Sequence, residues 1–196
     1  MELKDFIKIF AGALNPIIVG SLINYLNTRK FEPTKIIGSV KKGGQTVDKD
    51  IRNTDCWPFT HNPINDTSYS NVHWTNFLTG LFIQCYHEYN HVCKTEISCT
   101  EVGAIDALKY EEGGFYKPHH DHHSVVPRTL SMILFLNNDY EGGEVTFYNP
   151  NKEFTKVMSV SPQPGSILVW PSNFLYPHSV EKVTKGKRYT VVSWLL

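Results

Sequence analysis

The spacing of apolar residues divides the chain into two halves. In the first half, apolar residues recur every three or four positions over 16–27 and 70–89, which is the period of an amphipathic helix. From about residue 100, short runs rich in β-branched and aromatic residues alternate with turn signals such as Gly142-Gly143. Helices followed by many short strands predict a mainly β protein with flanking helices (α+β), in which a jelly roll is supported by N-terminal helices.

The first predicted helix has a clear start signal. Asn15 is a suitable N-cap and Pro16 a suitable first helical residue, so we expect the helix to span 16–27. Residues 5–14 are expected to form a strand that leads into a turn. The apolar residues that recur at helical spacing are Ile17, Ile18, Leu22, Ile23 and Leu26.

The second predicted helix, residues 70–89, follows a long irregular stretch. Residues 31–69 are rich in Gly, Pro, Asn, Asp and Thr, which predicts loops with short strands. A connection of this length is usually functional, so it is a candidate lid or binding loop. The residues expected to form the buried stripe of the helix are Trp74, Phe77, Leu78, Leu81 and Phe82.

Length and composition indicate one domain of ordinary type. The 196 residues are enough to bury a core, and we expect a single domain with residues 1–99 as a helical and loop-rich support and residues 100–196 as the core. The 19 basic and 19 acidic residues balance, so the net charge indicates neither a nucleic acid nor a membrane partner. The absence of a secretory signal pattern and of a long apolar run favours a cytoplasmic protein.

The cysteines follow no CxxC pattern, and we expect free thiols in a reducing compartment. The alternative is a disulfide between two of the last three. The four positions are Cys56, Cys85, Cys93 and Cys99.

The densest candidate chemistry lies in the sequence His119-His120-Asp121-His122-His123. On a strand, side chains alternate between the two faces, so His119 and Asp121 are expected on one face and His120 and His122 on the other. With a distant histidine, the first pair would form a facial triad of two imidazoles and one carboxylate, which leaves positions of an iron ion open. The cluster alone is also consistent with a structural zinc site or a polar surface patch.

A candidate for the distant histidine is His178. A turn at Lys185-Gly186 predicts a hairpin that brings Arg188 back toward it. A guanidinium group at that point is able to bind one end of a small dicarboxylate through two parallel hydrogen bonds. A surface position is the ordinary alternative for a single arginine on a strand.

The second half of the chain resembles the prolyl 4-hydroxylase family of the Fe(II)/2-oxoglutarate-dependent dioxygenase superfamily. The resemblance covers residues 100–196, and its motifs occur in the family's order. They are 110–121 (Tyr, a glycine pair, Tyr and Pro-His-x-Asp), 128–137 (an Arg-led strand ending in Leu-Asn), 141–147 (a Gly-Gly-Glu turn with its threonine shifted by one), 164–170 (a Pro-Gly strand) and the closing His178, Arg188 and Trp194.

The resemblance implies a double-stranded β-helix that holds iron and 2-oxoglutarate near one open end. It implies His119, Asp121 and His178 as the iron ligands, O2 as the second cosubstrate, and ascorbate as a reductant that keeps the iron in the Fe(II) state. The implied reaction decarboxylates 2-oxoglutarate to succinate and carbon dioxide while it hydroxylates a C–H bond of the substrate.

For the cosubstrate, the resemblance implies Arg188 as the partner of the C5 carboxylate, with Tyr110 and Thr190 as further contacts. One departure is Phe135, which stands where some relatives have a tyrosine that contacts 2-oxoglutarate. We therefore expect Phe135 to be an ordinary core residue.

For the substrate, the resemblance implies a peptide or protein that contains proline. The candidate substrate contacts are Arg128, His123 and Trp194, and residues 52–59 resemble the Arg- and Ser/Thr-containing loop that precedes the family's core. A free amino acid or another protein side chain is an alternative substrate. A jelly-roll binding protein without catalysis is an alternative of a different class, whereas no basic, aromatic-interleaved patch indicates a nucleic acid.

Overall fold

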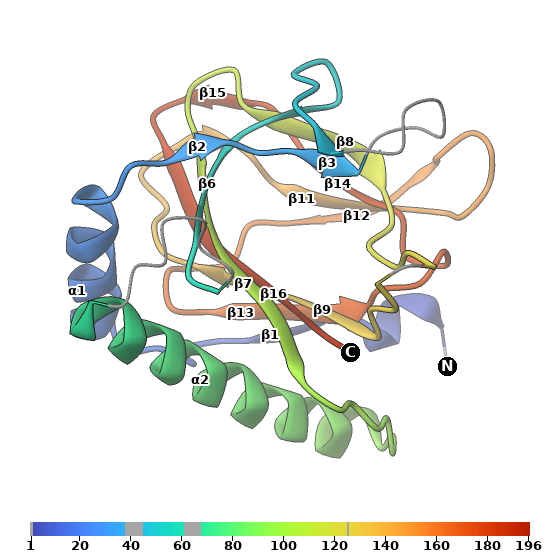
Figure 1. The fold of residues 1–196 in the computed structure, drawn as a ribbon. Coiled ribbons are helices and arrows are strands. Elements are labelled where there is room, and N and C mark those ends of the chain that lie inside the picture. The colour runs from blue at the N-terminus through green and yellow to red at the C-terminus, as the bar shows by residue number, and fades with distance from the viewer. Residues whose placement is uncertain (1, 38–44, 61–67, 125) are drawn as a thin grey trace.

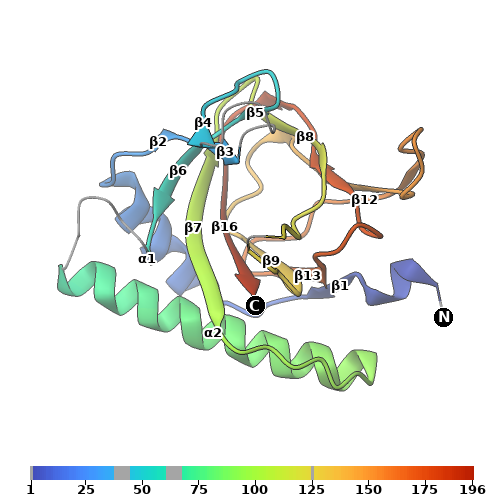
Figure 2. The same cartoon turned by 45° about the vertical axis from the view of Figure 1, so that its right-hand side comes forward.

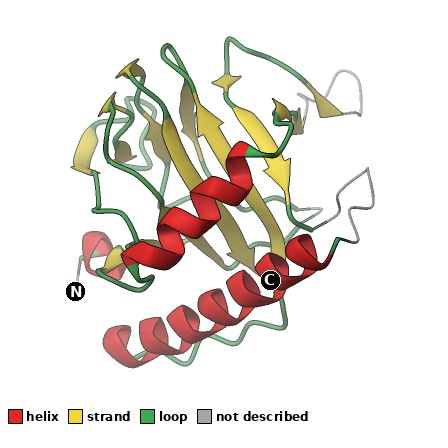
Figure 3. Ribbon diagram, turned by 90° about the vertical axis from the view of Figure 1, so that its left-hand side faces the viewer, coloured by secondary structure: helices red, strands yellow, loops and turns green. Residues whose placement is uncertain are grey.

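Two antiparallel sheets face each other in the computed structural model, which describes residues 2–37, 45–60, 68–124 and 126–196 (Figure 1). Both long helices lie against the outer face of the larger sheet (Figures 2 and 3). This arrangement is the jelly roll with flanking helices that the sequence predicts. Among the described residues, no helix combines the length and the apolar character needed to cross a membrane.

The larger sheet has seven strands in the order β1 (Lys8–Phe10), β13 (Ile167–Pro171), β9 (Leu130–Phe135), β16 (Arg188–Leu195), β7 (Val102–Tyr110), β6 (Asp55–Pro58) and β2 (Glu32–Pro33). The smaller sheet has five strands in the order β12 (Lys156–Val160), β11 (Val145–Tyr148), β14 (His178–Val180), β8 (Phe115–His119) and β5 (Arg52–Asn53). Two short ribbons pair β10 (Glu141–Gly142) with β15 (Val183–Lys185) and β3 (Ile36–Ile37) with β4 (Gln45–Thr46).

The larger sheet is buried on both faces. All six residues of β9 are buried. Leu130 and Leu134 pack in the cluster that includes the helices, whereas Ile133 and Phe135 belong to the cluster between the two sheets. Because side chains alternate along a strand, every second residue of β9 and its neighbours points into the space between the sheets. Polar residues at these inward positions therefore meet inside the jelly roll.

Helix α1 spans Pro16–Asn27, which confirms the predicted bounds, and the Asn15 side chain accepts a hydrogen bond from the backbone N–H of Ile17 at 2.8 Å. Ile17, one of the apolar residues at helical spacing, is 80% exposed. Ile17 and the buried Leu26 are nine residues apart, which is two and a half helical turns, so they lie on opposite faces. The buried residues of α1 are Val19, Leu22 and Leu26.

Helix α2 spans Tyr69–Cys93 and is one turn longer than predicted. It ends at Lys94, which takes a left-handed conformation (φ 52°) that stops the helix. Of the predicted stripe, Phe77 and Leu81 are only partly buried. The apolar stripe instead continues to the C-terminal end, and its buried members are Trp74, Leu78, Phe82, Cys85, Tyr89 and Cys93.

The predicted strand at residues 5–14 is shorter in the structure. A 3-10 helix, η1 (Leu3–Phe6), precedes β1, which has only three residues. The short strands expected within 31–69 are present as β2 to β6, while residues 38–44 and 61–67 of the predicted lid lie outside the described residues. All four cysteines are free, so the expectation of free thiols is confirmed and the disulfide alternative is wrong.

Candidate metal centre

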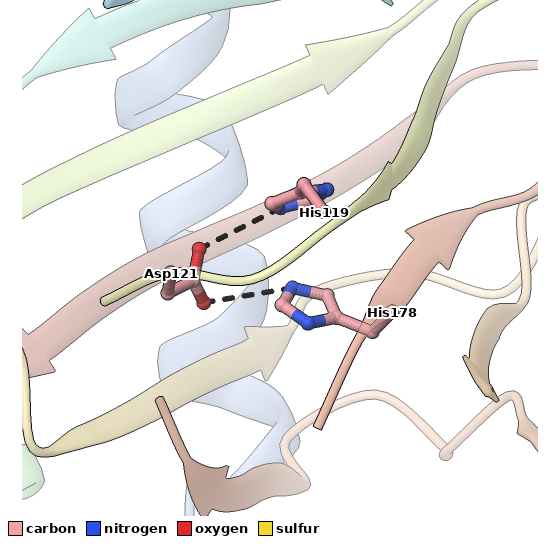
Figure 4. A group of neighbouring side chains, drawn as sticks. All are labelled: His119, Asp121 and His178. Carbon is pink, nitrogen blue, oxygen red and sulfur yellow. Dashed lines mark ion pairs between the residues drawn. The ribbon is translucent and has the colours of Figure 1, made fainter. Parts of the chain in front are cut away.

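Two side chains from the smaller sheet and one from the bend after β8 converge inside the jelly roll. His119 ends β8, Asp121 follows two residues later, and His178 begins β14, where it is the register partner of His119. The potential ligand atoms of the three residues lie within 4.8 Å of one another (Figure 4). The Nε2 atoms of His119 and His178 are each 3.5 Å from an oxygen of Asp121. The predicted triad is therefore brought together.

The strand prediction for this segment is only half right. β8 ends at His119, and the chain bends at Asp121 instead of continuing as a strand. The bend is fixed by the next residue, because the His122 backbone N–H donates to the Ser172 carbonyl at 2.9 Å. The exposed His120 and His122 each place Nδ1 beside a backbone carbonyl, at 3.1 and 3.0 Å, and neither belongs to the group of ligand atoms.

The two histidines of the triad are oriented by backbone carbonyls. Nδ1 of His119 lies 2.8 Å from the Lys117 carbonyl, and Nδ1 of His178 lies 3.1 Å from the Tyr176 carbonyl. A carbonyl only accepts hydrogen bonds, so each Nδ1 carries the proton and each Nε2 keeps its lone pair. Both lone pairs are therefore available to a metal ion.

Electrostatics favour the forms that bind metal. Burial alone would raise the pKa of Asp121, but His178, His119 and the Ser131 hydroxyl together hold the pKa of this carboxyl well below its usual range. Burial, followed by the influence of His119, lowers the pKa of His178 to about 4. At neutral pH, Asp121 is therefore ionised and His178 neutral, as metal coordination requires.

Aromatic rings enclose the two imidazoles. The His119 ring stacks on Tyr116 with 3.6 Å between centroids, and the His178 ring lies 4.8 Å from Trp170 and 5.9 Å from Phe147. These contacts limit the rotation of both rings. They make the geometry of the two nitrogen donors rigid before any ion binds.

The donor set suits Fe(II) better than a structural zinc ion. A structural zinc site is closed by four protein ligands, and the described residues supply only three here. Two imidazoles and one carboxylate are the facial triad of non-haem Fe(II) oxygenases, with open positions for other molecules.

A different metal-binding pattern occurs on α2, where His87-Glu88-Tyr89-Asn90-His91 matches the HExxH sequence of zinc peptidases. His87 and His91 are exposed, and no third metal-binding side chain joins them among the described residues. No residue of α2 lines the cavity that extends from the triad. This helix is therefore not a second candidate metal centre.

Arg188 is buried between the two sheets, with only 1% of the residue exposed. Its guanidinium carbon lies 5.1 Å from the Tyr110 ring centroid and 5.3 Å from that of Phe135, and Nη1 donates to Thr190 Oγ1 at 3.4 Å. Nε and Nη2 are buried and have no hydrogen-bond partner within the described parts of the chain. A permanently charged group with unsatisfied donors is costly inside a protein, so this position fits the carboxylate of a bound anion.

The structure places Arg188 differently from the predicted hairpin. The turn at Gly186 is present, with φ +80°. However, β14 belongs to the smaller sheet and β16 to the larger one, where β16 pairs with β7 and β9. Arg188 therefore enters the interior from the sheet opposite His178. The sequence pattern did not reveal this change of sheet, because both segments have the same strand-like character.

A cavity of about 1060 Å³ extends from the triad to β2, β5 and β6. The three predicted substrate contacts, Arg128, His123 and Trp194, all line it. The Arg128 guanidinium carbon stacks 3.6 Å from the Trp194 ring centroid, and its Nη1 donates to the Asp121 carbonyl at 3.4 Å. Arg128 is thus already engaged with the metal centre and the cavity wall, and His123 is exposed.

Four residues that line the cavity each have a buried polar atom without a hydrogen-bond partner among the described residues. The atoms are Thr34 Oγ1, Arg52 Nε, Trp57 Nε1 and Trp170 Nε1. Three of the four are N–H groups that only donate. These atoms have almost no exposed surface, so they lie behind the cavity wall rather than at its open face.

Two residues near the triad were not identified from the sequence. Ser131 Oγ donates to Asp121 Oδ2 at 2.7 Å and lies 2.7 Å from Ser172 Oγ, and both serines are buried. A signal for Ser131 does exist in the sequence: it is the one polar residue in the apolar run Leu130–Phe135. No comparable signal marks Ser172, which follows the strand β13.

Comparison with known proteins gives matches to oxygenases and hydroxylases. The model of the 2OG-Fe(II) oxygenase superfamily matches residues 105–196. A PKHD-type hydroxylase of Crocosphaera subtropica is 32% identical over 113 residues, which are 54% of this chain and 48% of that protein. Prolyl 3-hydroxylase 2 of Homo sapiens is 39% identical over 67 residues, so the match covers 34% of this chain but only 9% of that much longer protein.

The fold is also that of solved hydroxylase structures. A prolyl-4-hydroxylase from Pseudomonas putida superposes with a TM-score of 0.70 at 17% identity and covers 97% of this chain and 91% of its own. A prolyl hydroxylase from Trichoplax adhaerens, solved with a peptide fragment of the hypoxia inducible factor oxygen degradation domain, gives a TM-score of 0.70 at 16% identity, with 98% and 84% covered. At these identities the likeness establishes the fold.

Proposed function

Because residues 105–196 belong to the 2OG-Fe(II) oxygenase superfamily, we propose that this protein is an Fe(II)- and 2-oxoglutarate-dependent dioxygenase that hydroxylates prolyl residues in a peptide or protein. The observation that carries the proposal is the combination of the His-Asp-His triad with the unpaired, buried guanidinium of Arg188. The triad suits a metal ion with open coordination positions, and the guanidinium group suits a dicarboxylate.

His119, Asp121 and His178 would hold the iron, and residues 1–99 would support the core that contains them. Bound Fe(II) supplies the activation of O2 that is coupled to the decarboxylation of 2-oxoglutarate to succinate and carbon dioxide. Ascorbate is expected to keep the iron reduced. The role of the chain is to fix the geometry of the ligands, neutralise charge and exclude water.

Arg188 would bind the C5 carboxylate of 2-oxoglutarate through Nε and Nη2, which face the same edge of the guanidinium group. Thr190 keeps Nη1 occupied, and the rings of Tyr110 and Phe135 pack on either side. An anion at this position removes the cost of the unpaired charge. Exclusion of water then makes the ion pair stronger than it would be at the surface.

The cavity favours a peptide over a free amino acid. Its volume of about 1060 Å³ is at the upper end of the range of roughly 300–1,000 Å³ found for complete small-ligand sites. A single amino acid would leave most of it filled with water. Arg52 and Trp57, whose side chains carry N–H donors, line the cavity, and a prolyl residue offers a carbonyl acceptor without an N–H of its own.

The similarity to hydroxylases named for proline supports the same substrate class. The relatives differ in regiochemistry, since the human protein is named as a 3-hydroxylase and the Pseudomonas putida protein as a 4-hydroxylase. We propose hydroxylation at C4, because the motifs of residues 110–121 and 178–188 resemble those of prolyl 4-hydroxylases. Amino-acid analysis of the product separates the two isomers.

The test is turnover of 2-oxoglutarate with Fe(II) and ascorbate in the presence of proline-containing peptides, with free proline as the comparison. We expect succinate formation that depends on iron and is stimulated by a peptide, together with a 16 Da mass increase of that peptide. Binding of 2-oxoglutarate without turnover of any substrate would favour the non-catalytic binding protein. No iron-dependent binding of 2-oxoglutarate at all would exclude the proposed enzyme.

A further inference from the structure

Arg188 begins β16 at a point where the neighbouring strand on one side has already ended. On the β7 side, Arg188 is paired with Tyr110. On the β9 side, the last register pair is Thr190 with Phe135, and one more hydrogen bond joins Leu136 N–H to the Tyr189 carbonyl at 3.1 Å. The backbone around Arg188 therefore has a strand partner on only one side.

The side chain of Asn137 occupies the missing side. Its Nδ2 donates to the Lys187 carbonyl at 2.6 Å, and its Oδ1 accepts from the Tyr189 N–H at 2.7 Å. Lys187 and Tyr189 are the two residues that flank Arg188 in the chain. The side-chain amide thus takes the place of a backbone amide and extends the pairing past the end of β9.

The orientation of this amide is fixed by its neighbours. Nδ2 also donates to Asp139 Oδ1 at 2.6 Å, and a carboxylate only accepts hydrogen bonds. The nitrogen must therefore point toward Asp139 and Lys187, and the oxygen toward the Tyr189 N–H. The turn at Gly186 brings these groups together so closely that a Cβ at Gly186 would lie 2.8 Å from the Asp139 carbonyl oxygen.

The Arg188 side chain has few polar contacts of its own. The described residues offer it no carboxylate, and its one hydrogen bond, to Thr190, is long at 3.4 Å. The direction of the guanidinium group therefore depends on where the backbone places its Cα and on the rings beside it. Bidentate binding of a carboxylate tolerates little misplacement, so control of the backbone matters for affinity.

We infer that Asn137 is a positioning residue for the distal carboxylate of the cosubstrate, acting through the backbone on both sides of Arg188. This inference rests on the proposed function, in which Arg188 binds that carboxylate. Asn137 itself does not contact the cosubstrate. Its loss should weaken recognition of the distal carboxylate and leave the metal-binding end of the cosubstrate unaffected.

The experiment compares two 2-oxo acids in anaerobic titrations of the full chain loaded with Fe(II). 2-Oxoglutarate has the distal carboxylate, whereas 2-oxopentanoate has the same carbon chain without it. For Asn137→Ala we expect the dissociation constant for 2-oxoglutarate to rise about 10-fold, the scale of a lost buried hydrogen bond, and that for 2-oxopentanoate to stay the same. Asn138→Ala is the matched control, because Gln163 at 2.9 Å is the one side-chain hydrogen-bond partner of the exposed Asn138 among the described residues.

A purely structural role gives a different result. In that case the melting temperature of Asn137→Ala falls, but the folded protein keeps the wild-type preference for 2-oxoglutarate over 2-oxopentanoate, which overturns the inference. If Asn137→Ala does not fold, the double variant Asn137→Asp/Asp139→Asn serves instead, since it keeps the acceptor for Tyr189, lacks the donor for Lys187 and avoids two carboxylates in contact; an unchanged preference in this variant is again decisive against the inference. A wild-type protein that binds both acids equally overturns the proposed role of Arg188 instead.

Discussion

The Ser131 hydroxyl donates a hydrogen bond to Oδ2 of Asp121 at 2.7 Å. Because a hydroxyl has one proton, the second contact of Ser131, with Ser172 Oγ at 2.7 Å, must be donated by Ser172. The result is a directed chain from Ser172 through Ser131 to the carboxylate. It occupies Oδ2 and leaves Oδ1 as the freer oxygen for a metal ion.

Removal of the Ser131 hydroxyl should weaken iron binding. For Ser131→Ala we expect the dissociation constant for Fe(II) to rise about 10-fold or more, as is usual when a hydrogen-bond partner of a metal ligand is lost. Anaerobic titration with Fe(II) measures it. Ser131→Thr keeps the hydroxyl and should restore most of the affinity, whereas equal affinity in Ser131→Ala and wild type would show that the serine chain does not orient Asp121.

The choice of ligands within the histidine-rich segment is tested by comparing the Fe(II) affinities of two variants. Asp121→Ala removes the carboxylate from the triad and should abolish Fe(II) binding. His120→Ala should leave the affinity within about 3-fold of wild type, because the exposed His120 ring lies beside the His122 carbonyl and does not belong to the group of ligand atoms. Both are measured by the same titration, and a similar loss in the two variants would mean that the assigned ligand register is wrong.

The sequence predicted the site residues whose side chains suit a metal or an anion and whose order along the chain follows the family's motifs. His119 and Asp121 were selected by strand alternation, yet β8 ends at His119 and the carboxylate reaches the site through a bend. The two side chains still reach the same group of ligand atoms, because a bend after one residue also turns the second side chain inward. His178 and Arg188 were predicted from motif order, which specified their roles but not the sheets that contain them.

The parts that were not predicted depend on contacts between distant segments. Asn137 was read only as the end of a motif, whereas its hydrogen bonds reach across 50 residues to Lys187 and 52 to Tyr189. The contact of Ser131 with Ser172 spans 41 residues in the same way. In α1, helical spacing alone does not identify the buried face: Ile17 is apolar, but its position on the helix faces away from the sheet.

Cysteine reactivity tests the core beneath α2. Burial, with a smaller contribution from Glu88, raises the pKa of Cys85 to about 12, so its thiol stays protonated at pH 8. We expect iodoacetamide at pH 8 to modify the partly exposed Cys99 at least 10-fold faster than Cys85, as followed by peptide mass spectrometry. In denaturant the two rates should become similar. Fast modification of native Cys85 would contradict the packing of α2 on the sheet.

The charge of Arg188 should cost stability in the absence of its ligand. Arg188→Met keeps a long apolar side chain between the Tyr110 and Phe135 rings but removes the unpaired donors. We expect this variant, free of cosubstrate, to be more stable than wild type by roughly 1–2 kcal/mol, since burial of an unsatisfied charged group is unfavourable. Wild type should gain melting temperature with 2-oxoglutarate, and Arg188→Met should lose this gain while it still binds Fe(II). Thermal unfolding with and without 2-oxoglutarate measures both effects.

A destabilised Arg188→Met variant would show that the rings on either side stabilise the cation by more than its missing partners cost, and a ligand response equal to wild type would remove Arg188 from the site. Arg128→Met is the matched control, because Arg128 already has Trp194 and the Asp121 carbonyl as partners, so its loss should not increase stability.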